Sequence, residues 1–172
     1  MYKKIIGVLE KYSHGDRFKW SGTTTLRCTL WHLNIACQLL CEDASVVYII
    51  DKDYSQIALH VAAENGHVSI MREILLHRPD TCSVVNKFGQ NILHLGIKNN
   101  QKEVVEYIIK ECPVISSLIN QKDVDGNTPS HLMALPDCYF PQLIQHDMVD
   151  KGALNNENLT PLVSNLHTYA AN

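Results

Sequence analysis

The sequence lacks a long apolar segment, an excess of charge of either sign and the common catalytic motifs. Its 172 residues include fifteen basic and eighteen acidic side chains, which give a formal net charge of -3. This balance offers no large attraction to nucleic acid or to anionic lipid. The apolar run from Ala44 to Ile50 is interrupted by Ser45 and ends at Asp51, far short of the roughly 20 residues of a membrane-spanning helix. We therefore expect no nucleic-acid partner and no direct insertion into a membrane.

Nucleophiles and bases do not stand in a recognisable order, since GxSxG, HExxH, Walker and GxGxxG patterns are all missing. We expect a protein that is not an enzyme and needs no cofactor; a metal-binding or catalytic protein is the alternative. The cysteines show no CxxC pair and follow no signal peptide, which predicts buried thiols in a reducing, cytoplasmic compartment. Two of them lie four residues apart on one predicted helix, Cys37 and Cys41, and a redox or metal role is the alternative to a place in the core. The six cysteines are Cys28, Cys37, Cys41, Cys82, Cys112 and Cys138.

A repeated pattern is the strongest feature that the sequence does contain. The stretch from Ile57 to His67 reads IALHVAAENGH, and its His60 recurs as His94 and His131, at intervals of 34 and 37 residues. A period of about 20 to 50 residues indicates stacked units that bury a core only against their neighbours. We expect one domain over residues 1–172, made of a partial unit at 1–20, a degenerate unit at 21–51, full units at 52–85 and 86–120, a degenerate unit at 121–154 and a partial unit at 155–172.

The sequence pattern of each full unit predicts two helices joined by a tight turn. The turns fall at Asn65-Gly66 and Asn99-Asn100, where a residue with positive φ lets the first helix end and the chain reverse. Pro79 and Pro113 follow the second helices. The predicted helices are Ala58–Glu64 and Val68–His77 in one unit, and Ile92–Lys98 and Glu103–Cys112 in the next.

The copies IALHVAA, NILHLGI and TPSHLMA resemble the TPLHxAA pattern of the ankyrin repeat. The resemblance implies an all-α solenoid of helix pairs with short β-hairpin fingers, which binds other proteins on the concave side formed by fingers and first helices. It also implies that His60, His94 and His131 are structural and hold the hairpin to the helix through hydrogen bonds. A shared zinc ion is disfavoured because equivalent residues of stacked helices lie about 8–10 Å apart, whereas zinc needs nitrogens within about 2.1 Å.

More narrowly, AAENGHVSIMREIL, NKFGQNILH, VVEYIIKEC, LINQKDVDGNTPSHL and DKGALNNENLTPL are similar to plant ankyrin-repeat proteins of the accelerated-cell-death type. Proteins of that family carry a cytosolic ankyrin array followed by membrane-spanning helices, and they are associated with defence, cell death and salt stress at the plasma membrane. The resemblance implies an interaction scaffold at the cytosolic face of the plasma membrane, held there by a partner or by a C-terminal segment missing from this chain. The alternative is a soluble regulator that stacks on full-length, membrane-anchored relatives. The residues expected to mediate that stacking are Leu162, Val163 and Leu166 at one end and Ile5, Val8 and Leu9 at the other.

Three departures from the pattern weaken individual units. Arg27 stands where the first copy would have its histidine, and Ser130 replaces a core leucine. Ser55 replaces a turn glycine, which costs about 1 kcal/mol if that residue adopts a positive φ. We therefore expect the best-protected core in the middle units, at Leu59, Ile74, Leu93 and Ile108.

Polar and aromatic positions that the repeat leaves free are the candidate partner-binding residues. Tyr54 and Phe88 occupy the same place on adjacent hairpin tips, 34 residues apart, where the pattern gives an aromatic side chain no packing role. We predict that both anchor a partner; the alternative is that they cover a neighbouring hairpin. The full set is Asp53, Tyr54, Gln56, Glu64 and Asn65 in one unit, Lys87, Phe88, Gln90, Lys98 and Asn99 in the next, and Val124, Asp125 and Asn127 in the fourth.

Overall fold

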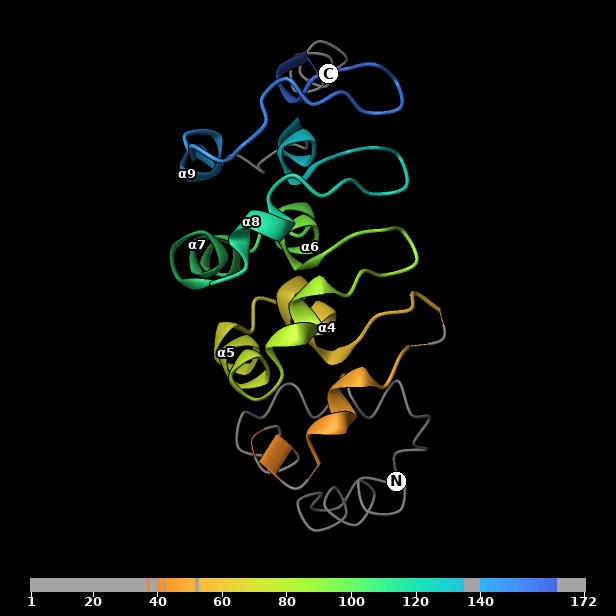
Figure 1. Cartoon of the computed structure of the whole chain (residues 1–172), viewed down its shortest axis with the longest axis vertical. Helices are drawn as coiled ribbons and strands as arrows, with labels where there is room; N and C mark the ends of the chain where they lie inside the picture. The colour runs from red at the N-terminus through yellow and green to blue at the C-terminus, as the bar shows by residue number, and fades with distance from the viewer. Residues whose placement is uncertain (1–36, 38–39, 42, 52, 135–139, 164–172) are drawn as a thin grey trace.

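The computed structural model describes residues 37, 40–41, 43–51, 53–134 and 140–163. Helices lie in two columns along an elongated stack, and the loops between successive pairs, called fingers below, project from one side (Figure 1). The inner column contains α4 (Ala58–Glu64) and α6 (Ile92–Lys98), and the outer column contains α5 (Val68–His77), α7 (Lys102–Glu111) and α9 (Pro141–Ile144). This arrangement confirms an all-helical fold of stacked helix pairs.

The two full units have the helices that their periodicity predicts. The bounds of α4, α5 and α6 agree with the prediction, and α7 begins and ends one residue earlier than expected. No residue of the described part lies in a β-strand, so the fingers are turns. The remaining elements are short: η1 (Ala44–Tyr48), η2 (Pro79–Ser83), α8 (Ile115–Leu118) and η3 (Pro129–Ala134).

The core runs along the interface between the columns. All but the last residue of α4 and of α6 is buried, whereas α5 and α7 bury one face only. The side chains of Leu59, Ile74, Leu93 and Ile108 are at most 1% exposed. Within the described part of the chain, no helix combines the length and the apolar character that crossing a bilayer requires.

The turn between paired helices depends on a residue with positive φ in both full units. Gly66 has φ 80° and Asn100 has φ 52°, at the two predicted turns. A Cβ at Gly66 would lie only 2.5 Å from the side-chain oxygen of Gln101. That side chain donates its amide hydrogen to the Glu64 carbonyl at 2.9 Å, which ties the turn of one repeat to the turn of the next.

Ser55 has a φ of 54°, the strained conformation anticipated for this position. Ser55→Gly is expected to raise the free energy of unfolding by about 0.5–1 kcal/mol, because glycine removes the left-handed strain while adding some entropy to the unfolded chain. Urea unfolding followed by circular dichroism measures the change. The control is Ser69→Gly on the exposed surface of α5, which is expected to lower stability; a decrease at Ser55 as well would contradict the prediction.

The segment around His131, expected to form the fourth unit, differs from the two full units. Its first helix is the short 3₁₀ element η3, in place of the α-helix that stands at this point in the full units. Ser130 is buried there, and its hydroxyl makes no hydrogen bond to the described part of the chain. A buried hydroxyl without a partner is costly compared with the leucine that the pattern places there.

The expectation of buried thiols is correct for Cys82 and Cys112 and wrong for Cys41. Cys41 is exposed and Cys37 half-buried, so the spacing of four residues does not place both in the core. Helical spacing fixes which residues share a face, but the packing of neighbouring elements decides whether that face is covered. Cys28 and Cys138 lie outside the described residues, as do Arg27, Leu166 and the residues of the first partial unit.

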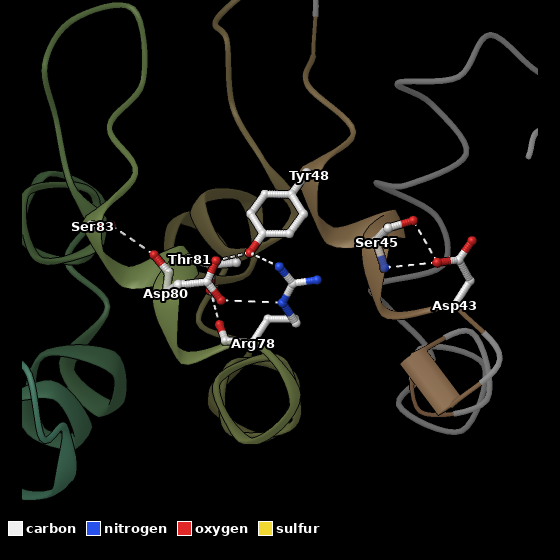
Figure 2. A network of polar contacts seen from close by, with 7 residues as sticks. All are labelled: Asp43, Ser45, Tyr48, Arg78, Asp80, Thr81 and Ser83. Atoms are coloured by element: carbon white, nitrogen blue, oxygen red, sulfur yellow. Dashed lines mark hydrogen bonds and ion pairs between the residues drawn. The ribbon is translucent and has the colours of Figure 1, made fainter.

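A polar cluster joins η1 to η2 and was not anticipated from the sequence (Figure 2). The Tyr48 hydroxyl donates to the Asp80 carboxylate and accepts from the Arg78 guanidinium at 2.7 Å. The guanidinium also pairs with Asp80 at 3.3 Å and stacks 4.5 Å from the Tyr48 ring centroid. The hydrogen bonds from Tyr48 and Arg78 lower the pKa of Asp80. Asp43 caps η1 by accepting from the Ser45 N–H at 3.0 Å. The cluster therefore fastens the degenerate first unit to the repeat that follows.

Candidate partner-binding groove

Four fingers are closed by the same device, a side-chain oxygen of Asp or Asn that accepts backbone N–H groups within its own turn. Asn86 accepts from Phe88 and Gln90, both at 2.9 Å. Asp51 accepts from the Asp53 N–H at 2.5 Å and the Tyr54 N–H at 2.9 Å. Asp123 accepts from the Asp125 N–H at 3.0 Å and the Asn127 N–H at 2.8 Å. Asn155 accepts from the Glu157 and Leu159 N–H groups, both at 3.0 Å. This role was not predicted, although an Asp or Asn three or four residues before each positive-φ residue is a recognisable signal in the sequence.

The fingers are also bonded to one another, which fixes their tips in a row. The Lys87 N–H donates to the Tyr54 carbonyl at 3.0 Å, and the Val124 N–H donates to the Phe88 carbonyl at 3.0 Å. The Asn156 N–H makes the same contact with Asp125 at 3.0 Å. Side chains presented by consecutive fingers are therefore held at set positions along one edge of the stack (Figure 1).

Tyr54 and Phe88 contact each other on the first two of these tips. Their ring centroids are 6.3 Å apart, and the Lys87 ammonium lies 4.6 Å from the Tyr54 centroid and 5.1 Å from that of Phe88. Each ring therefore covers its neighbour, which is the packing role that the sequence alone did not supply. Both rings nevertheless stay accessible, with Tyr54 45% and Phe88 37% exposed.

A small groove lies between these tips and the inner helices. It has a volume of about 210 Å³, and seven of its nine lining residues belong to the set selected from the sequence. Those seven are Tyr54, Gln56, Glu64, Phe88, Gln90, Lys98 and Asn99, and the other two are Asn86 and Leu95. The selected residues outside the lining are Asp53, Asn65, Lys87, Val124, Asp125 and Asn127.

The floor of the groove is polar, and it is more enclosed than the sequence suggests. Gln56 and Gln90, taken from the repeat pattern as free positions, are buried, each 6% exposed. Gln56 donates its amide hydrogen to the Glu64 carboxylate at 3.1 Å, while its side-chain oxygen accepts no hydrogen bond from the described residues. This oxygen has almost no accessible surface, so it is closed off from the groove.

Asn65 and Asn99 close the ends of the inner helices. The side-chain amide of Asn65 donates to the Val61 carbonyl at 2.8 Å, and that of Asn99 donates to the Leu95 carbonyl at 2.9 Å. Each amide satisfies a carbonyl that the end of a helix leaves without an intrahelical partner. These two candidates therefore have a capping role, and Asn99 also lines the groove.

The three repeated histidines connect one repeat to the next. In each ring, Nδ1 accepts the backbone N–H of the residue three positions earlier: Ile57 at 3.2 Å for His60, Asn91 at 3.3 Å for His94 and Thr128 at 3.1 Å for His131. The neutral ring then carries its proton on Nε2, which donates to a carbonyl further along the chain. Those carbonyls belong to Val84 at 3.0 Å, Asn127 at 3.1 Å and Leu159 at 3.0 Å, respectively.

Burial keeps the rings of His60 and His94 neutral. It lowers the pKa of His60 to about 4, and it lowers the pKa of His94 as well. The carbonyl contacts to Val84 and Asn127 oppose that shift without reversing it. Among the described residues, no group of His, Cys, Asp or Glu side chains is arranged to hold a metal ion.

Asn91, the residue just before α6, is a further polar residue that was not singled out from the sequence. Its side-chain oxygen accepts from the Leu93 N–H at 3.0 Å and the His94 N–H at 3.1 Å. Its amide donates to the Leu118 carbonyl at 3.0 Å and the Gln121 side chain at 2.8 Å. Asn91 is fully buried, so this one side chain caps α6 and fixes it to the segment after α8.

Comparisons with known proteins agree with this architecture. Residues 27–117 match the family model described as ankyrin repeats (3 copies). A putative ankyrin repeat protein of Rickettsia felis is 36% identical over 74 residues, which is 42% of this chain and 33% of that protein. The NF-kappa-B inhibitor cactus of Drosophila yakuba and that of Drosophila melanogaster are each 32% identical over 54 residues, 31% of this chain and 11% of theirs. The aligned part is thus a third or less of each relative.

Proposed function

We propose that this chain, which belongs to the ankyrin-repeat family, binds a protein partner in the groove between its first two finger tips and its inner helices. The observation that carries the proposal is the convergence of two exposed rings with polar residues of the inner helices in one hollow. The name of the two Drosophila relatives, inhibitors of NF-kappa-B, supports a role exerted on another protein. The function proposed is a non-enzymatic interaction scaffold.

The groove is suited to an extended peptide segment. An apolar or aromatic side chain of the partner packs against Tyr54 and Phe88, since ring-on-ring contacts gain energy beyond the area that they bury. Lys87 and Lys98, held close to the rings, add a preference for a carboxylate on the partner.

Replacement of both rings tests the proposal. Tyr54→Ala with Phe88→Ala is expected to weaken binding by about 2–4 kcal/mol, or roughly 30- to 1000-fold in Kd. The chain is used as bait in cell extract, recovered proteins are identified by mass spectrometry, and affinities are then measured by calorimetry. The matched control is Leu76→Ala, an exposed apolar residue of α5 on the outer column. Recovery of the same partners with equal affinity by the double variant would refute the groove as the binding site.

The finer assignments depend on the sequence resemblance and stay hypotheses. A role in plant defence, cell death or stress signalling at the cytosolic face of the plasma membrane draws no support from the relatives in Rickettsia felis and Drosophila. Stacking on longer, membrane-anchored relatives is the second candidate, and the exposure of Leu162 beside half-buried Val163 favours it. Fractionation of cells with and without such a relative tests it, and unchanged distribution of the chain would count against recruitment.

A further inference from the structure

Two cysteines from consecutive repeats lie side by side in the core, apart from the groove. Cys82 belongs to η2, and Cys112 follows the last residue of α7, so 30 residues of chain separate them. Their sulfur atoms are 3.9 Å apart, and the two residues are 2% and 4% exposed. The groove does not include either residue.

A cavity of about 550 Å³ next to this pair gives small molecules a route to it. Cys82 forms part of the cavity wall, together with Arg72, Tyr107 and Glu111, which belong to α5 and α7. Arg72 pairs with Glu111 at 2.6 Å and lies 4.7 Å from the Tyr107 centroid. The cavity is therefore framed by the outer column, opposite the fingers (Figure 1).

The contact between the sulfur atoms divides their acidity. A hydrogen bond between the two thiols lowers the pKa of Cys112, and the same bond together with burial raises the pKa of Cys82. Either sulfur can be the donor of this bond, and Cys82 is the one that lines the cavity. One sulfur can therefore be oxidised while its neighbour closes the bond.

We propose that Cys82 and Cys112 form a reversible disulfide when the protein meets a peroxide. The thiolate of one cysteine attacks one oxygen of hydrogen peroxide, the O–O bond breaks, and the released hydroxide takes up a proton as water. That cysteine is then a sulfenic acid. The sulfur of the other cysteine loses its proton and attacks the first sulfur, the S–O bond breaks, and a second water leaves. Two thiols thus lose two electrons and two protons, and the peroxide is reduced to two waters.

Bond formation requires the two sulfur atoms to approach from 3.9 Å to the bonded distance of about 2.05 Å. The bond closes a loop of 30 residues and links two consecutive repeats. A crosslink of this span restricts the unfolded chain.

Oxidation of the full chain with hydrogen peroxide, followed by alkylation of the remaining thiols and peptide mapping without reductant, tests the proposal. We expect the Cys82 and Cys112 peptides to be recovered joined, with loss of two hydrogen atoms from the intact mass. The midpoint of thermal unfolding should rise by about 5–10 °C, and a phosphine reductant should reverse both changes. Separate alkylation of Cys82 and Cys112, while other cysteines of the chain are oxidised, would overturn the proposal.

Two variants separate this pair from the more accessible thiols. Cys37→Ala with Cys41→Ala should leave the joined peptides and the thermal shift unchanged, because neither residue takes part. Cys112→Ala should abolish both, and circular dichroism before oxidation checks that this variant folds. If the Cys112→Ala variant does not fold, peptide mapping of the unmodified chain still shows whether Cys82 and Cys112 are joined. A thermal shift that survives in a folded Cys112→Ala variant would refute the assignment.

Discussion

Leu93→Ala is expected to lower the free energy of unfolding by about 2–5 kcal/mol, the range for truncation of a fully buried leucine. Leu93 has no exposed surface and lies on α6, which packs against α4, α7 and η3. The cavity left by the truncation therefore opens between two consecutive repeats, and the surrounding backbone can close it only by moving both. In a linear stack, loss at such an interface weakens the units on either side as well.

Urea unfolding of the variant, followed by circular dichroism, measures this loss. Leu76→Ala is the matched control, because Leu76 is 77% exposed on α5 and the same atoms are removed. Its effect should stay within about 0.5 kcal/mol. Equal losses for the two variants would mean that the middle of the stack is no better packed than its surface.

Acidification is expected to destabilise the protein by about 3 kcal/mol between about pH 7.5 and pH 4 through His60 alone. The pKa of the ring is 6.5 in an unfolded chain and about 4 in the folded one. Below pH 6.5 His60 binds a proton in the unfolded chain but stays neutral in the folded chain, so acid stabilises the unfolded state relative to the folded state. The stabilising contribution is complete above pH 6.5 and is lost as the pH falls toward 4. His94, whose pKa is also lowered, adds to the effect in the same direction.

Two measurements check this linkage. The His60 ring signals in a nuclear magnetic resonance titration of the folded protein should show a neutral ring until the pH approaches 4. The variant His60→Gln keeps an amide that reaches toward Val84 but cannot titrate, so its unfolding free energy should fall less steeply over the same pH range. A ring of His60 that titrates near 6.5 in the folded protein would contradict the prediction.

Helix positions were predictable from the sequence because each repeat buries the same faces in the same order. The recurrence of His60 as His94 and the turn residues after each first helix were sufficient to place α4, α5 and α6 correctly. The same period selected Tyr54, Phe88 and most residues that line the groove. Residues at equivalent positions of adjacent repeats lie next to each other along the stack. The period therefore predicts which residues share a surface wherever the repeats are regular.

Contacts between residues about 30 positions apart were not predictable in the same way. Tyr48 meets Asp80, Cys82 meets Cys112, and Gln101 meets the carbonyl of Glu64. Each contact depends on the rotation and shift between adjacent repeats, which the spacing of a sequence pattern does not specify. The burial of Gln56 and Gln90 has the same origin, since both face into the groove between two neighbouring fingers.

The contacts of the histidine Nε2 atoms all point in one direction along the chain. His60 reaches forward to Val84, His94 to Asn127 and His131 to Leu159, so each Nε2 is satisfied by a residue translated after the ring. On a ribosome that adds about 5–20 residues per second, each histidine waits on the order of seconds for its acceptor to be made. The interval from histidine to acceptor is longest for His94, at 33 residues. A nascent chain halted inside such an interval holds an incomplete repeat, which makes these the intervals in which a cotranslational chaperone would be needed.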